Sequence, residues 1–76
     1  MERNAFEYLY SLKKEQANPN GVNADFEQGV LKGIVEMAFF AGIITDEEMA
    51  TYYGEIYSIY SIVNKLEMFT EQKEAR

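Results

Sequence analysis

The sequence of 76 residues contains no cysteine, no histidine and one proline. Without cysteine and histidine, disulfide bonds, thiol nucleophiles, imidazole acid–base catalysis and the usual structural zinc sites are excluded. No apolar run approaches the ~20 residues of a membrane-spanning helix. The start of the chain also lacks the basic and then apolar segments of a signal peptide. We therefore expect a cytoplasmic protein that is not an enzyme, needs no cofactor and does not bind a membrane.

The residues that are present indicate one folded domain over positions 1–76. Apolar residues make up 47% of the chain and include six tyrosines and five phenylalanines, which is too hydrophobic for a disordered protein. Thirteen acidic and seven basic residues give a net charge of -6, whereas a protein that binds nucleic acid directly normally has a basic surface.

Two breaks in the apolar pattern divide the chain into helices. The first is the segment from Asn18 to Ala24, where proline, asparagine and glycine at positions 18–21 favour a turn. The second is Gly42, which suits the left-handed conformation that ends a helix, so that Ile43 can fold back onto the last turn. Thr45 with Glu48 three residues later matches a capping box at the start of the next helix.

These breaks predict helices at about 3–17, 25–41 and 46–72, and no segment alternates with the period of a half-buried strand. We therefore expect an all-α fold, a three-helix bundle with a long C-terminal helix. The second predicted helix is apolar on nearly all sides, which indicates a central position. One stripe on it has heptad spacing and consists of Phe26, Val30, Gly33, Met37 and Phe40. Gly54, in the middle of the third predicted helix, would be explained by a close neighbouring helix.

The third predicted helix has the clearest heptad seam, which consists of Met49, Tyr52, Ile56, Ile59, Val63 and Leu66. With about 27 residues and a length of ~40 Å, this helix exceeds the first two, which would measure ~22–26 Å. Its last turns would have no cover within the chain, so we expect a homodimer. The predicted interface consists of Ile59, Ile62, Val63, Leu66 and Phe69. The alternative is that the first helix extends further along the third.

The excess negative charge is confined to positions 25–60, where seven acidic residues accompany a single base, Lys32. Tyrosines of the third predicted helix lie close to these acids and could anchor Arg or Lys side chains of another protein. The candidate partner-binding residues are Asp46, Glu47, Glu48, Tyr52, Tyr53, Glu55 and Tyr57. The alternative is that the acids serve helix capping and solubility.

The same acids argue against two other kinds of site. Asp46, Glu47 and Glu48 are successive helical residues that point in different directions, so no metal site is expected. If the turn at 41–45 were part of a helix-turn-helix motif, three carboxylates would begin the recognition helix, where DNA phosphates would repel them.

In length and composition, the chain resembles the short, acidic, cysteine-free helical proteins of phages and mobile elements, among them anti-CRISPR inhibitors. The acids behind this resemblance are Asp25, Glu27, Glu36, Asp46, Glu47, Glu48 and Glu55. The resemblance implies a non-enzymatic inhibitor that occludes a basic, nucleic-acid-handling site on a partner protein. The alternative is a structural homo-oligomerisation module that acts only through its apolar seam.

Overall fold

The computed structural model describes residues 2–61, and within them the chain forms three helices and no strand. Helix α1 spans Arg3–Glu15, α2 spans Ala24–Phe40 and α3 spans Asp46–Ile59. The expected all-helical fold is thus confirmed, with α1 ending two residues before its predicted end and α2 offset by one residue. Helix α3 starts at its predicted residue but ends at Ile59, with a turn at Tyr60. The predicted continuation of the third helix beyond position 61 lies outside the described residues.

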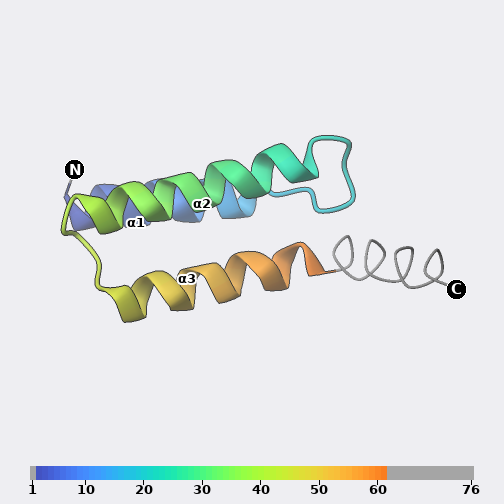
Figure 1. Cartoon of the computed structure of the whole chain (residues 1–76). Coiled ribbons are helices and arrows are strands. Elements are labelled where there is room, and N and C mark those ends of the chain that lie inside the picture. The colour runs from blue at the N-terminus through green and yellow to red at the C-terminus, as the bar shows by residue number, and fades with distance from the viewer. Residues whose placement is uncertain (1, 62–76) are drawn as a thin grey trace, which may run out of the picture.

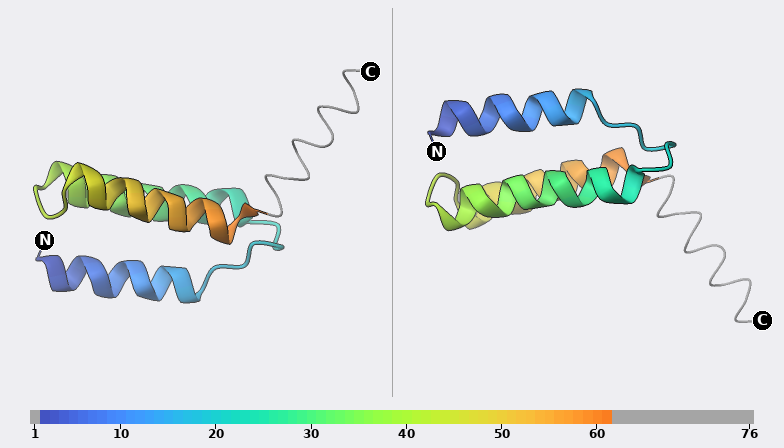
Figure 2. Two further views of the ribbon diagram at one scale, coloured as in Figure 1. Left: turned by 90° about the horizontal axis from the view of Figure 1, so that it is seen from below. Right: turned by 90° about the horizontal axis from the view of Figure 1, so that it is seen from above.

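The helices alternate in direction, and α2 is antiparallel to both α1 and α3, which run from left to right in Figure 1. Helix α2 packs against both other helices. Seen from below and from above, α2 and α3 overlap and α1 lies beside them (Figure 2). Helices α1 and α3 meet through long side chains rather than through close approach of their backbones. The expected central position of the second helix is therefore confirmed. None of the described helices combines the length and the apolar character of a membrane-spanning segment.

Both predicted helix junctions form. At the first, the Gly21 amide donates to the Asn18 carbonyl at 2.9 Å and closes a turn. At the second, both helix ends are closed as expected. Gly42 has a φ of +76°, and the amides of Gly42 and Ile43 donate to the carbonyls of Phe39 and Ala38 at 3.0 and 2.9 Å, which closes the end of α2. At the start of α3, Thr45 and Glu48 form the reciprocal bonds of a capping box. These bonds satisfy backbone groups that would otherwise lack partners at the two helix ends.

The core lies where the three helices face one another. Its buried residues are Phe6, Tyr10, Ala24, Leu31, Val35, Ala38, Ile44, Ile56 and Tyr60. The described part of the predicted seam on α3 points toward this core: Ile56 is buried, and Met49, Tyr52 and Ile59 pack around it. The Tyr52 ring contacts the rings of Phe6 and Tyr10 edge to face, with centroids 5.2 and 4.7 Å apart.

The heptad stripe on α2 lies on the outside of the described structure. Phe26, Met37 and Phe40 are 74%, 63% and 81% exposed, whereas Leu31 and Val35 on the opposite side are buried. Helix α2 has apolar residues on both sides, and α1 and α3 together cover only one of them. The neighbouring helix expected beside Gly54 is also absent from the described part of the chain, because a Cβ atom there would meet nothing within 4 Å.

Candidate functional site

The candidate site is a shallow depression of about 390 Å³ on α3, which we call the acidic groove. Its lining residues are Glu47, Glu48, Thr51, Tyr52 and Glu55. Four of them belong to the predicted partner-binding set. They come together because they lie on one side of α3, within a stretch of about two turns. Bases and tyrosine from α1 reach two of the three carboxylates.

Glu48 has a structural task at one end of the acidic groove. Its carboxylate accepts hydrogen bonds from the Arg3 guanidinium and, at 3.0 Å, from the backbone amide of Thr45. These bonds lower the pKa of Glu48 to about 2, and the bond from Arg3 has the larger effect. Arg3 also donates to Glu7 at 3.0 Å and to the carbonyl of Ile43 at 3.3 Å, so it joins α1 to the junction before α3.

Glu55 is held at the other end of the acidic groove. Its Oε1 atom accepts hydrogen bonds from the Tyr10 hydroxyl at 2.9 Å and from Lys14 Nζ at 3.0 Å. Partial burial acts to raise the pKa of Glu55, but the bonds from Lys14 and Tyr10 outweigh burial and lower it. Burial, and then the bond to Glu55, raises the pKa of the Tyr10 phenol.

Between these ends, Tyr52 closes the groove toward the core, and burial raises the pKa of its phenol. Glu47 differs from the other two carboxylates. Among residues 2–61 the ion pairs join Arg3 to Glu7 and Glu48, and Lys14 to Glu55, so neither Glu47 nor the neighbouring Asp46 has one. Both are exposed on the first turn of α3. Glu47 is therefore the groove carboxylate that a cation from another molecule can meet without displacing an internal base.

The remaining predicted site residues lie elsewhere. Tyr53 and Tyr57 face α2, where the Tyr53 hydroxyl donates to Glu36 at 2.8 Å and Lys32 donates to the Tyr57 hydroxyl at 3.2 Å. Lys32 Nζ also lies 4.5 Å from the centre of the Tyr57 ring. These tyrosines thus hold charged side chains of α2 and do not line the acidic groove.

Of the predicted dimer interface, only Ile59 lies among the described residues, where it is half-buried against the core. The other members lie outside the described residues, and they are Ile62, Val63, Leu66 and Phe69.

Sequence reasoning missed Arg3, Tyr10 and Lys14, which set the charge and geometry of the groove. A usable signal was present, because residues 3–15 contain Arg3, Lys13 and Lys14, whereas the third helix begins with three acids. Opposite charge on two helices of one small bundle favours their pairing.

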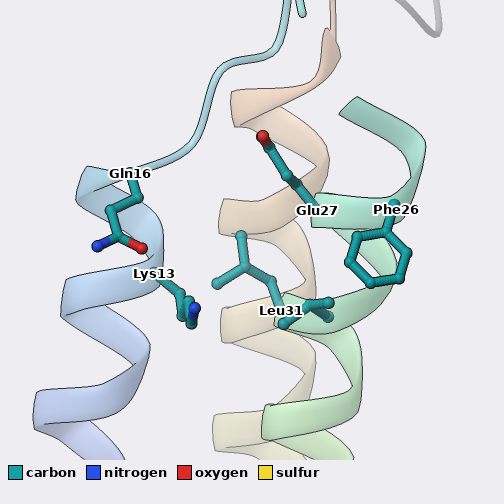
Figure 3. A pocket seen from close by; sticks show the side chains of 6 residues that line it. Lys13, Gln16, Phe26, Glu27 and Leu31 are labelled. Atoms are coloured by element: carbon teal, nitrogen blue, oxygen red, sulfur yellow. The ribbon is translucent and has the colours of Figure 1, made fainter. Parts of the chain in front are cut away.

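A second hollow lies between the C-terminal half of α1 and the N-terminal half of α2 (Figure 3). Its volume is about 240 Å³, below the ~300–1,000 Å³ of typical small-molecule sites. Its lining residues are Lys13, Gln16, Phe26, Glu27, Val30 and Leu31. Two of them, Phe26 and Val30, belong to the apolar stripe of α2, so this hollow is the edge of that stripe.

Residues 2–61 contain no group of three acidic side chains that could hold a metal ion. Comparison of the chain with protein-family models, curated proteins and solved structures gives no match. The function is therefore argued from the geometry of the chain itself.

Proposed function

We propose that this chain is a non-enzymatic interaction protein whose acidic groove occupies a basic, nucleic-acid-handling site on a partner protein. The observation that carries this proposal is the exposed position of Glu47 and Asp46 beside a groove whose other carboxylates are already held by α1. The groove has a fixed shape, and the carboxylates at one edge have no ion pair among the described residues. This favours binding of a partner Arg or Lys, because few groove side chains lose freedom on binding.

The groove also supplies an apolar surface for such a side chain. Tyr52 lies in the groove with its ring packed against Phe6 and Tyr10, so its position is set before binding. An Arg or Lys has an apolar stem and a charged end, which match the Tyr52 ring and the Glu47 carboxylate respectively. Occupation of the partner's basic site would then exclude nucleic acid by steric overlap, as the resemblance to phage inhibitors implies.

The test compares two charge reversals that change net charge equally. Glu47→Lys reverses the uncompensated carboxylate of the groove, whereas Glu15→Lys reverses an exposed carboxylate at the end of α1, outside the groove. A partner captured from a host lysate and identified by mass is purified, and its affinity for each variant is measured at low and moderate salt. We expect Glu47→Lys to weaken binding about tenfold or more, and Glu15→Lys to leave it within about twofold.

Glu48 and Glu55 are unsuitable for this test, because reversing either would also break a contact with α1. Equal weakening by Glu47→Lys and Glu15→Lys would show that only overall charge matters. If the affinity for the partner changes neither with Glu47→Lys nor with salt concentration, the electrostatic proposal is refuted. Release of nucleic acid from the partner on addition of the wild-type chain tests the occlusion step separately.

We also propose the homodimer, the long C-terminal helix and the cytoplasmic location expected from the sequence. The second candidate function is a structural homo-oligomerisation module without an inhibitory role. The exposed apolar stripe of α2 favours it, because such a surface usually marks an interface. The two functions depend on different residues. Partner binding depends on Glu47 of α3, and oligomerisation depends on the apolar stripe of α2.

A further inference from the structure

The side of α2 that faces away from the core is apolar along the whole helix, and we call it the outer face. It consists of Phe26, Gly29, Val30, Gly33, Met37 and Phe40. At 3.6 residues per turn these positions fall within an arc of about 100°, and no charged residue of α2 falls inside that arc. Such a stripe is as wide as the face that a surface helix normally turns toward a core.

The charges beside the outer face are drawn toward α3. Glu36 accepts a hydrogen bond from the Tyr53 hydroxyl at 2.8 Å, and Lys32 lies against the Tyr57 ring and donates to its hydroxyl at 3.2 Å. Both side chains therefore already have polar partners in the single chain. Covering the outer face therefore leaves these two charges at its margin, each with a hydrogen-bond partner on α3.

The outer face also has the size that a small interface requires. A fully covered aromatic side chain buries ~150–250 Å². Phe26 and Phe40 are 74% and 81% exposed, and Met37, of similar size, is 63% exposed, so the three side chains expose roughly 400 Å² in total. A pair of such faces buries roughly 800 Å² from these three residues alone. Val30 and the backbone at the glycines bring the total near the ~1,000 Å² of a specific protein interface.

We propose that a second copy of this chain covers the outer face, with the two α2 helices antiparallel and crossing at Gly33. This rests on the proposed homodimer and moves its interface to α2 from the third-helix segment predicted from the sequence. The spacing of the residues is self-complementary about Gly33. Phe26 and Phe40 each lie seven positions from it, so Phe26 of one copy meets Phe40 of the second copy. Gly29 and Met37 each lie four positions from it, so each Met37 meets a glycine.

The glycines fit this arrangement. A Cβ atom at Gly29 or Gly33 would meet nothing within 4 Å in the described chain, so packing against α1 or α3 does not require glycine at either position. A second helix crossing at Gly33 would use the missing side chains, because its backbone can approach closely there.

Charge selects the antiparallel orientation. The first turn of α2 contains Asp25 and Glu27. A parallel pair would bring these four carboxylates together at one end, whereas an antiparallel pair places them at opposite ends, about 20 Å or more apart. The antiparallel pair also sets each helix N-terminus beside the C-terminus of the other helix, which favours opposite dipole ends.

The first test measures the mass of the full chain by sedimentation equilibrium. We expect a dimer for the wild type, and an increase of about a hundredfold or more in the dissociation constant for Met37→Glu, because the substitution buries a charge in the interface. Tyr8→Glu is the matched control, since Tyr8 is 71% exposed on α1 and lies outside the outer face. Tyr8→Glu should remain dimeric, and circular dichroism should show equal helicity in both variants.

The second test uses the absence of cysteine from the chain. Gly33→Cys places each thiol beside its own symmetry mate, so mild oxidation should give a covalent dimer. Phe26→Cys places the two thiols roughly 20 Å apart, so the same oxidation should leave single chains. Phe26→Cys combined with Phe40→Cys should again give the covalent dimer.

Three results would overturn the assignment. They are a monomer at high protein concentration, cross-linking of Phe26→Cys alone, and a dimer that survives Met37→Glu but dissociates with Leu66→Asp. The last result would place the interface on the segment predicted from the sequence. Glu47→Lys tests the proposed partner binding of the acidic groove separately, because it should change partner affinity and leave the mass of the dimer unchanged.

Discussion

The hydrogen bond from Tyr10 to Glu55 joins α1 to α3, and its removal gives a defined test of the described packing. Tyr10 is 3% exposed, and its hydroxyl donates to Glu55 Oε1 at 2.9 Å. Tyr10→Phe removes this hydroxyl and retains the ring against Tyr52. Hydrogen bonds to charged groups contribute about 1.5–3 kcal/mol. We expect a smaller loss of about 1–1.5 kcal/mol, because the Glu55 side chain is 42% exposed and keeps Lys14 at 3.0 Å.

A loss of this size corresponds to a decrease in Tm of about 4–12 °C for a chain of this length. The measurement is thermal unfolding by circular dichroism at neutral pH, with urea unfolding as a second readout of the free energy. Glu55→Gln and the double variant complete a double-mutant cycle that isolates the coupling between the two side chains. A Tm for Tyr10→Phe within about 1 °C of the wild type would refute the stabilising hydrogen bond between Tyr10 and Glu55.

The same bond predicts a pH dependence. The folded state lowers the pKa of Glu55 below its ordinary value of 4.5, so the bond's contribution is present above that pH. The contribution is lost as the pH falls through the lowered folded pKa. The difference in stability between the wild type and Tyr10→Phe should therefore be constant near neutral pH and decrease below about pH 4.5. A difference that grows on acidification would have the wrong sign for a hydrogen bond to a carboxylate.

Two further substitutions test α3. Thr45→Ala removes the hydroxyl that accepts from the Glu48 amide at 3.2 Å, and it should lower the free energy of unfolding by about 1 kcal/mol in urea titration. An unchanged midpoint would contradict the capping box. Gly54→Ala should raise stability by about 0.5–1 kcal/mol, because a Cβ atom there meets nothing within 4 Å and alanine favours the helix. A lower Tm would instead show that another segment packs against this position.

The helix junctions could be predicted from the sequence because local chemistry determines them. Gly42 adopts the left-handed conformation that other residues avoid, and Thr45 with Glu48 satisfies neighbouring amides. Neither feature depends on the rest of the fold. The seam of α3 was also predictable as far as Ile59, since only one side of that helix has large apolar residues at heptad spacing.

The sides of α2 could not be assigned in the same way. Its inner residues, such as Leu31 and Val35, and its outer residues, such as Phe26 and Met37, are both apolar and both recur at helical spacing. Periodicity shows that two sides can be buried, but not which side α1 and α3 cover. The inner side contains Ala24 and Ala38, whose small side chains let two helices approach α2 together.

The candidate site was only partly predictable for a related reason. The sequence places Glu47, Glu48 and Glu55 on one helix, but the contacts that distinguish them come from α1. Arg3 and Lys14 pair with two of these carboxylates, and neither pairs with Glu47. Which acid is compensated depends on how the two helices are aligned, and that alignment is a property of the folded bundle.

The two proposals are compatible because they use different sides of the chain. The contacts of the acidic groove are with α1, whereas the outer face of α2 lies away from the core and borders α1 only at the hollow that Phe26 and Val30 help to line. A dimer formed through the outer face therefore leaves both grooves open. The net charge of -6 on each chain acts against self-association, but charges more than about 8 Å apart are largely screened at physiological ionic strength. Since the outer face itself has no charge, this screened repulsion adds little to the ordinary entropic cost of association, and the acids remain available for a basic partner.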